Sequence, residues 1–304
     1  ASIHDSRSDG GWASRGRCPR SICRRCWAEI VAIGERLRTV LAHPGVVLLG
    51  LIGLGLLLGP WLVPHGPRLP DWEQAATGPS LATGHWLGTD AIGRDILARV
   101  LAGGRVSLAV GVGAALTAVL LGGLLGAWAG FRGGLVDAGV SLVADVGTSL
   151  PFLLIVVLLL SVFEPSLTLL MLAIAGYAWI DVARIVRPEA ARLAAMPFIE
   201  AARGVGLSNA RIYARHLLPN LQGPIALGLS QTVPAAILME SFLSFLGLSP
   251  LEGGASLGSL IADGVHELDS NPAALIAPAL LLMAILYALQ DLADGIAAHE
   301  PPLP

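Results

Sequence analysis

Long apolar stretches separated by polar segments mark the chain from about Val46 onward. An apolar helix of about 20 residues crosses a hydrocarbon core of about 30 Å, and in lipid its backbone groups must pair with one another. The pattern therefore predicts an all-α polytopic membrane protein with six transmembrane helices. The predicted spans cover about residues 46–63, 106–129, 136–163, 167–186, 224–246 and 272–292.

The polar segments divide the chain into four predicted regions. Residues 1–43 form an Arg-rich N-terminal segment, in which apolar positions recur at helical spacing over residues 27–41 and predict an amphipathic helix on the membrane surface. Residues 44–104 hold the first span and an external loop rich in proline and glycine. Residues 105–296 hold the other five spans, and residues 297–304 form a tail.

The placement of arginine indicates how these helices are oriented. Six spans put both termini on one side of the membrane, and cytoplasmic termini put fifteen of the nineteen arginines inside. Positive charge is concentrated in cytoplasmic loops. We therefore expect cytoplasmic termini, and the Arg-rich segment 187–222 then faces the cytoplasm.

Composition agrees with a membrane protein and excludes several chemistries. The chain is 54% hydrophobic and only 13% charged, with a mean hydropathy of +0.71, which is more apolar than a soluble domain of this length. It contains no lysine, the residue that a P-loop, a protein kinase and Schiff-base chemistry all require. If ATP drives this protein, another chain must bind it.

Two motifs outside the spans are interpreted without special chemistry. Cys18, Cys23 and Cys26 have the C-x4-C-x2-C spacing that begins a plant-type iron–sulfur pattern, but the fourth ligand is missing, so we interpret them as reduced thiols and assign no metal. Gly254–Gly258 fits G-x-S-x-G, yet the strand and helix that position a hydrolase serine are not predicted around it. A glycine-rich outer loop is expected there.

Small and charged residues within the spans point to helix packing and to function. Asp145 and Glu240 lie in or near spans, where an ionised carboxylate is costly, so each marks either a structural pair or a contact with substrate or gate. Asp137, near the inner surface, is expected to be solvated. Glycine at four-residue spacing favours close helix packing in lipid, unless it is merely tolerated in a glycine-rich chain. This spacing occurs at Gly122, Gly126 and Gly130.

The cytoplasmic segment 196–220 predicts two short helices joined by a sharp turn. Pro197 suits the first helical position and Gly206 suits the C-terminal cap. Ser208 is placed as the N-cap of the second helix, and Pro219 is expected to end that helix before the fifth span. Held beneath a membrane bundle, such an element is shaped to dock on a soluble partner.

The side chains of this segment support docking. Ala201 and Ala202 would allow close approach of a partner, and Leu207 and Ile212 stand where a hydrophobic staple would pack. Four charged residues are available for ion pairs. They are Glu200, Arg203, Arg211 and Arg215.

The run Glu200–Ala202, with Gly206 and then His216–Asn220, resembles the EAA signature of permease subunits in binding-protein-dependent ABC importers. In that family the segment is the coupling helix region, which sits in a groove on the ATPase subunit and transmits its movement to the spans. The resemblance thus implies a set of coupling residues. They are Glu200, Ala201, Ala202, Arg203, Gly206, Ser208, Arg211, His216, Pro219 and Asn220.

Further stretches resemble the peptide and nickel branch of this family, in particular its C-type permease. They are His85–Asp90 with Gly93–Asp95, Asp145–Pro151 with Ala183–Arg187, and Glu240–Gly247 with Ile261–Gly264. The resemblance implies the type I ABC importer permease fold in a bacterial inner membrane. It also implies a homologous second permease, two ABC subunits that bind ATP and Mg²⁺, an extracytoplasmic solute-binding protein and a peptide substrate. We expect no catalysis by this chain and no nucleic-acid partner.

Two other functional classes remain as alternatives. An ion-driven secondary transporter would need no docking segment and would usually show internal repeats and broken helices at the bilayer midplane. A non-transporting membrane scaffold or receptor would recruit a soluble partner without moving a solute. Copurification with an ATPase, together with uptake measurements, separates the three.

Overall fold

A computed structural model describes residues 44–249 and 255–299 of the chain. Within this part the only β-pairing is two isolated bridges in the loop after the first helix, and the elements are otherwise helices and turns. The all-α prediction is confirmed. The predicted amphipathic helix at residues 27–41 and the three cysteines lie outside the described residues.

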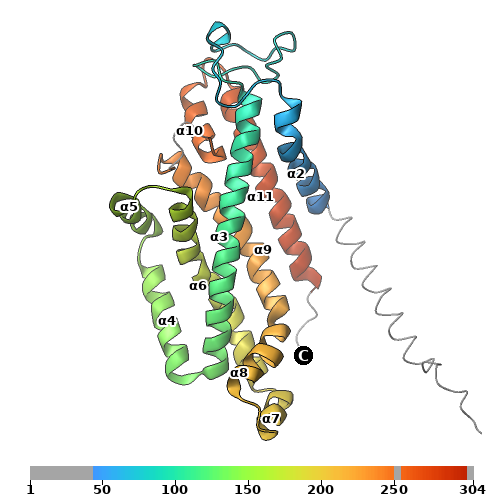
Figure 1. Cartoon of the computed structure of the whole chain (residues 1–304), viewed down its shortest axis with the longest axis vertical. Helices are drawn as coiled ribbons and strands as arrows, with labels where there is room; N and C mark the ends of the chain where they lie inside the picture. Colours follow the sequence, from blue (N-terminus) through green and yellow to red (C-terminus); the bar gives the residue numbers. More distant parts are fainter. Residues whose placement is uncertain (1–43, 250–254, 300–304) are drawn as a thin grey trace, which may run out of the picture. The chain divides into compact units, whose positions relative to one another are not determined.

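Among the described residues, eight helices of ten residues or more form a bundle (Figure 1). They are α2 (Pro44–Leu62), α3 (Ile96–Arg132), α4 (Gly134–Ser149), α5 (Phe152–Val162), α6 (Leu167–Ala194), α9 (Gln222–Phe245), α10 (Leu257–His266) and α11 (Ala273–His299). Two short helices, α7 (Pro197–Gly204) and α8 (Asn209–Ile212), lie between α6 and α9.

Each predicted span falls on one of these helices or on a helix pair. In the described part, four helical stretches are long and apolar enough to cross a membrane: Ile96–Arg132, Leu167–Ala194, Asn209–Phe245 and Ala273–Ala297. The first predicted span is α2, whose apolar stretch Pro44–Gly59 is shorter.

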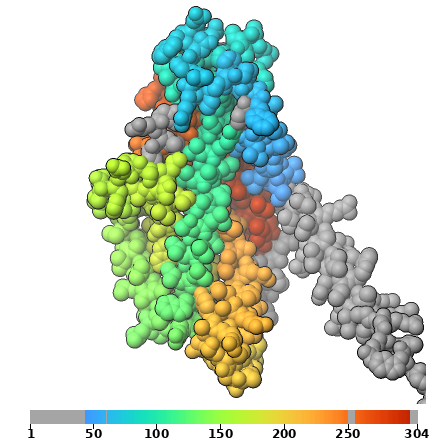
Figure 2. Space-filling view, viewed as in Figure 1, coloured from blue at the N-terminus to red at the C-terminus, as the bar shows by residue number. Residues whose placement is uncertain are grey.

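The third predicted span is not straight. It is the pair α4 and α5, bent by 86° at Pro151. Counted as one span, this pair brings the total to five. Proline has no amide hydrogen to continue the helix, which explains the position of the break. Figure 2 shows α5 projecting from the side of the bundle, and six of its eleven residues are exposed.

The long helix α3 packs against α6 through the glycine stripe. A Cβ atom added at Gly126 would lie 2.9 Å from the Cα atom of Ala183. At Gly122 and Gly130 it would collide with the backbone carbonyl oxygens of Trp179 and Arg187. The prediction of close helix packing is confirmed, because only glycine leaves room for the α6 backbone at these three positions.

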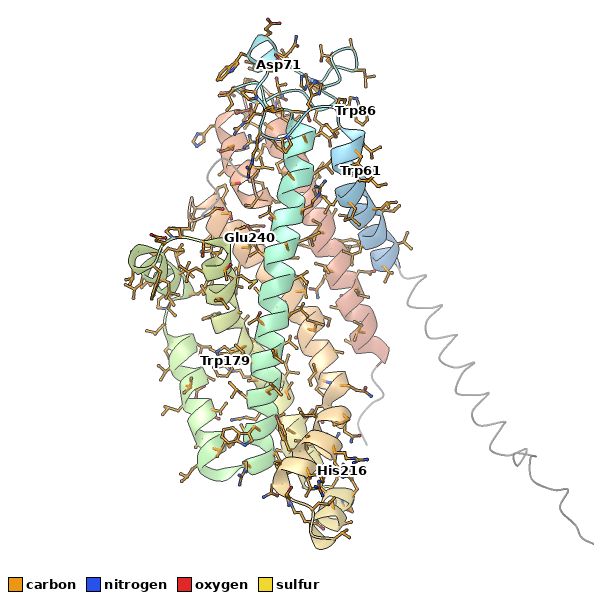
Figure 3. All side chains as sticks on the ribbon, viewed as in Figure 1. Trp61, Asp71, Trp86, Trp179, His216 and Glu240 are labelled. Carbon is orange, nitrogen blue, oxygen red and sulfur yellow. The ribbon has the colours of Figure 1, made fainter. Side chains whose placement is uncertain are left out.

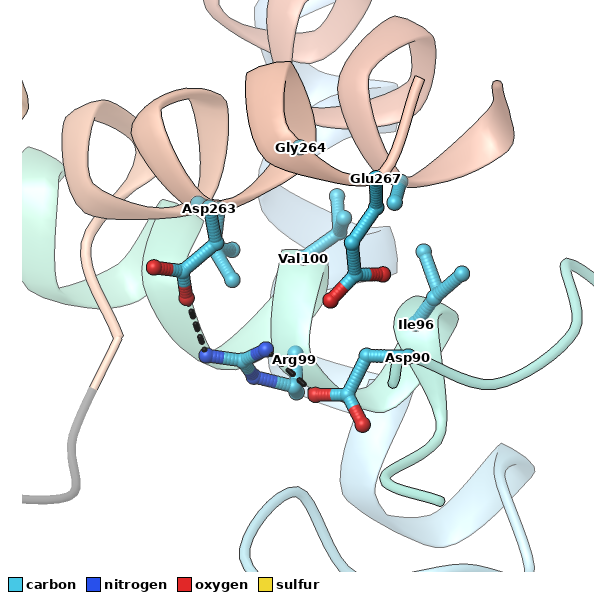
Figure 4. A pocket seen from close by; sticks show the side chains of 9 residues that line it. Asp90, Ile96, Arg99, Val100, Asp263, Gly264 and Glu267 are labelled. Carbon is cyan, nitrogen blue, oxygen red and sulfur yellow. Dashed lines mark hydrogen bonds and ion pairs between the residues drawn. The ribbon is translucent and has the colours of Figure 1, made fainter. Parts of the chain in front are cut away.

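The loop between α2 and α3 covers one end of the bundle, and α7 and α8 lie at the opposite end (Figure 1). Arg99 on α3 is 93% buried and holds this loop to α10: its guanidinium donates to Asp90 at 2.6 Å and to Asp263 at 2.9 Å (Figure 4). Arg94 donates to the same Asp90 carboxylate at 2.7 Å. The motif that begins at His85 therefore has a structural role, because its ion pairs hold the loop against α3 and α10.

His65, His85 and Asp95 lie close together beside these ion pairs and are residue types that bind metals. Hydrogen bonds within the loop already engage several of their possible ligand atoms. His85 Nδ1 lies 2.8 Å from Asp95 Oδ2, and Asp95 Oδ1 accepts the amide of Ala98 at the N-terminus of α3. The His65 ring stacks on the His85 ring with centroids 4.0 Å apart. Both Asp95 oxygens are thus engaged in the fold of the loop, and the assignment of no metal stays a prediction.

Candidate functional site

The first half of segment 196–220 folds as its capping residues predict. Met196 has the extended backbone of an N-cap and Pro197 opens α7. Gly206 has φ +83°, a conformation that residues with a side chain rarely adopt. The amide of Leu207 donates to the carbonyl of Ala202 at 3.2 Å, which is the backbone bond of a glycine-terminated helix.

The second half is only partly as predicted. Ser208 occupies the N-cap position of α8, although its side chain makes no capping hydrogen bond. Ile212 is fully buried, and Leu207 packs against the same cluster, as expected of a hydrophobic staple. The staple therefore fixes the entry into α8 where the serine hydroxyl does not.

The prediction that Pro219 ends the second helix is wrong. The chain stays helical from α8 through a π turn, Tyr213–Leu217, and a 3-10 turn, Leu218–Leu221, directly into α9. Pro219 lies in the first turn of the 3-10 stretch. The regular α-helical hydrogen bonds are already interrupted there by the preceding π turn, so the missing amide hydrogen of proline costs little. The segment and α9 are thus one continuous helical body.

One face of the segment is buried against the lower ends of α3 and α6. A single apolar cluster joins residues of the segment to residues of the two long helices. From the segment come Ile199, Ala202, Ile212 and Leu217, Leu221 follows directly after it, and from α3 and α6 come Val119, Ala127, Phe131, Val182, Val186 and Ala190. The segment is therefore packed directly against α3 and α6.

The other face of the segment is exposed at the end of the bundle (Figure 1). Ala202 is only 7% exposed and belongs to the apolar cluster with α3 and α6, whereas its neighbour Ala201 faces outward. His216, labelled in Figure 3, is partly buried. The exposed members of the predicted set are Glu200, Ala201, Arg203, Gly206, Ser208, Arg211, Pro219 and Asn220.

The exposed face carries charged side chains that form no ion pair within the part of the chain that the structure describes. Within residues 44–249 and 255–299, no ion pair involves Glu200, Arg203, Arg211 or Arg215. The guanidinium of Arg203 lies 5.5 Å from the centre of the Phe131 ring on α3, within cation–π range. These charges are thus available to a partner.

One residue that sequence reasoning did not single out, Tyr213, fixes the segment to α3. The Tyr213 hydroxyl donates to the carbonyl of Leu124 at 2.9 Å, and its ring lies 6.0 Å from that of Phe131. The carbonyl of His216 accepts a hydrogen bond from the Asn220 side chain at 2.6 Å. A tyrosine at an apolar position of the segment indicates a buried ring with a hydrogen-bonded hydroxyl. The sequence does not reveal the acceptor, because Leu124 is 89 residues away.

The two intramembrane carboxylates differ in environment. Glu240 on α9 is 1% exposed and accepts hydrogen bonds from Ser244 at 2.8 Å and Ser241 at 3.3 Å (labelled in Figure 3). In the described part, no basic group lies within ion-pair distance of Glu240. The side chain of Asp145 on α4 is 73% exposed and lies 3.5 Å from Arg184 on α6. A structural ion pair thus exists for Asp145 only.

Two further expectations meet different outcomes. Asp137 is not simply solvated, because Arg187 lies 3.3 Å away and the aspartate side chain is 38% exposed. Ser256 is the N-cap of α10, where its hydroxyl accepts the amide of Ser259 at 3.3 Å. The G-x-S-x-G stretch therefore contributes a helix cap, and Ser256 is fully buried.

Comparison with known proteins covers most of the chain. Residues 122–295, which include the whole segment, match the family model "Binding-protein-dependent transport system inner membrane component". The chain is 36% identical over 259 residues to the oligopeptide transport system permease protein OppC of Haemophilus influenzae, covering 85% of this chain and 83% of that protein. It is 40% identical over 255 residues to OppC of Escherichia coli K12, covering 84% of each.

A third relative and a solved structure extend the comparison. The dipeptide transport system permease protein DppC of Bacillus subtilis is 37% identical over 265 residues, covering 86% of this chain and 82% of that protein. A chain of the MetNI methionine ABC transporter, solved in inward-facing conformations, superposes with a TM-score of 0.52 at 17% identity. The match covers 65% of this chain and 94% of that one. At this identity the likeness concerns the fold alone.

Proposed function

We propose, because the chain belongs to the family of binding-protein-dependent transport system inner membrane components, that it is the permease subunit of an ATP-driven peptide importer. Its apolar helices make it an integral membrane protein. Peptide as the substrate is supported by the relatives, whose names are oligopeptide and dipeptide permeases. The chain itself catalyses no reaction in this proposal.

One observation carries the coupling role: segment 196–220 has a buried face fixed to α3 and α6 and an exposed face with unneutralised charge. The cluster supplies a packed connection to the spans, and the outward charges supply contacts for a partner. In the proposed complex the exposed face docks on an ATPase subunit. Closure of two such subunits around ATP and Mg²⁺ pushes the segment, and the cluster passes this movement to the spans.

The remaining partners follow from the same proposal. A homologous second permease completes the pathway, since one bundle of this size leaves α4 and α5 largely uncovered. An extracytoplasmic binding protein delivers the peptide to the end that carries the loop between α2 and α3. The segment then lies in the cytoplasm of a bacterium and the protein in its inner membrane, in agreement with the arginine distribution.

The test is transport by the purified complex in proteoliposomes, with the binding protein added on the side of the loop. We expect the chain to copurify with an ATPase and a labelled tripeptide to be taken up only when ATP is present. Uptake that follows an ion gradient without ATP would instead identify a secondary transporter. Copurification without uptake of any tested peptide would contradict peptide import.

A further inference from the structure

A group of charged side chains lies at the surface between α4 and α6, away from the coupling segment. Arg184 is 3.5 Å from Asp145 and 3.9 Å from Asp181, and its guanidinium also donates to Thr148 at 3.2 Å. The exposed fractions of the three charged side chains are 73% for Asp145, 66% for Asp181 and 48% for Arg184. We call these three residues the α4–α6 charged patch.

A cavity adjoins this patch. It has a volume of about 110 Å³ and lies between α4 and α6. Its polar lining comes from Ser141 and Asp145 on one helix and from Arg184 and Arg187 on the other. The patch is therefore the charged rim of a polar recess.

The carboxylates of the patch lie well inside the helices that carry them. Asp145 is about 16 Å along α4 from Gly134, and Asp181 is about 20 Å along α6 from Ala194, at about 1.5 Å per residue. Arginine can extend its long side chain toward a membrane surface, but aspartate has a single methylene and cannot. Asp145 and Asp181 lie within the predicted spans 136–163 and 167–186, where an exposed aspartate that faces lipid is costly.

Polar residues continue along the same side of α4. Ser141, Thr148 and Ser149 lie one helical turn before or after Asp145, whereas much of the rest of α4 is apolar. A polar stripe of this kind on a spanning segment faces water or a cavity rather than lipid. The stripe, the recess and the exposed carboxylates thus all indicate an aqueous space beside α4 and α6.

The charge of the patch selects its ligand. Two carboxylates share one guanidinium, so the patch carries one surplus negative charge, and both ion pairs are longer than a charge-assisted hydrogen bond of about 2.8 Å. The carboxylate oxygens therefore keep acceptor capacity for a second cation. An ammonium group is the cation that a peptide supplies, at its amino terminus or on a lysine side chain.

We propose that the α4–α6 charged patch lines the translocation pathway and binds ammonium groups of the passing peptide through Asp145 and Asp181. Arg184 holds the two carboxylates in place between passages. This inference rests on the proposed function, since it presupposes that peptides cross beside this subunit. It makes the patch a determinant of charge preference among peptides, in addition to any selection by the binding protein.

The test compares two tripeptides, Ala-Lys-Ala and Ala-Glu-Ala, in proteoliposomes that contain the complete transporter. The ratio of their initial uptake rates is measured for the wild type, Asp145→Asn and Asp181→Asn. Removing one exposed carboxylate is expected to lower the Lys-to-Glu ratio about threefold to fivefold, the factor that a solvent-screened charge contact supplies. The preference of the binding protein cancels, because every variant receives peptide from the same binding protein.

The matched control is Asp269→Asn, an exposed carboxylate in the turn after α10, which should leave the ratio unchanged. A ratio that stays at the wild-type value in both patch variants, while uptake continues, overturns the inference alone. A wild-type complex that hydrolyses ATP but imports neither tripeptide overturns the proposed function and this inference together.

A second measurement covers variants that lose all uptake. Asp181→Cys is made in a chain whose Cys18, Cys23 and Cys26 are replaced by serine, and inverted membrane vesicles are treated with a cationic, membrane-impermeant thiol reagent. The control is Leu120→Cys, at an exposed apolar position of α3. We expect the thiol at position 181 to react at least about tenfold faster than the one at position 120. Equal rates would mean that the patch does not face water, and the inference would be wrong.

Discussion

Glu200→Arg is expected to lower ATP-dependent peptide uptake at least about tenfold while the protein still assembles in the membrane. Glu200 is exposed on α7 and forms no ion pair within the described residues, so replacing it costs the fold little. At a docking face the reversed charge would meet a surface complementary to a carboxylate. Each loss of about 1.4 kcal/mol in binding free energy lowers the affinity about tenfold. Placing like charges against each other at an interface costs several kcal/mol. Uptake and ATPase copurification are measured on the same preparations.

The matched control is Glu164→Arg, the same charge reversal at an exposed residue of the turn between α5 and α6. It should retain uptake near the wild-type value. Normal uptake in Glu200→Arg would argue strongly against coupling through α7. Equal losses in both variants would show that the effect reflects net charge rather than docking.

Gly122→Val is expected to destabilise the bundle by about 3 kcal/mol, lowering the melting temperature by about 5–10 °C in detergent. The added side chain would collide with the backbone carbonyl of Trp179 and with the side chain of Val182. Backbone cannot move aside as a flexible side chain can, so α3 and α6 must separate. The separation would also open the apolar cluster that holds segment 196–220 against α3 and α6. Fluorescence-detected size exclusion after heating measures the loss.

Gly176→Val is the control for this substitution, because it adds the same side chain to α6 at a position where nothing lies within 4 Å of the new Cβ atom. Its melting temperature should stay within about 2 °C of the wild type. If both variants melt alike, the glycine stripe does not set the α3–α6 distance.

Much of the fold could be predicted from the sequence because lipid leaves few choices. An apolar stretch in a membrane has to be helical, so all six stretches were found as helices. The glycine stripe could also be predicted, since four-residue spacing places glycine on one side of a helix. The 86° bend between α4 and α5 could not, because Pro151 indicates a break but not its angle.

The candidate site was predictable where local backbone chemistry decides and unpredictable where distant contacts do. Pro197 and Gly206 were placed correctly because their backbone preferences act locally. The prediction for Pro219 was wrong because the π turn before it already interrupts the α-helical hydrogen bonds, so the chain stays helical through the proline. The burial of Ala202 beside the exposed Ala201 depends on where α3 and α6 end, which a sequence pattern does not reveal.

Contacts across long sequence separations were also beyond prediction. Arg99 and Asp263 are 164 residues apart, and nothing local to either residue indicates the pair. Glu240 was expected to have either a structural partner or a place on the pathway, and serine hydroxyls of its own helix turned out to be its partners. A carboxylate satisfied within one helix leaves no signal elsewhere in the chain.

The most direct test of the account is where the exposed face of α7 lies in the working complex. A photo-crosslinking side chain is introduced at Ala201, which faces outward, and separately at Ala202, which is buried in the apolar cluster with α3 and α6. The intact complex is then irradiated without nucleotide and with ATP. Position 201 should crosslink to the ATPase subunit, and position 202 should crosslink within its own chain. A crosslink from position 201 to the external binding protein, or none to any ATPase, would contradict the assignment of segment 196–220 as the coupling element.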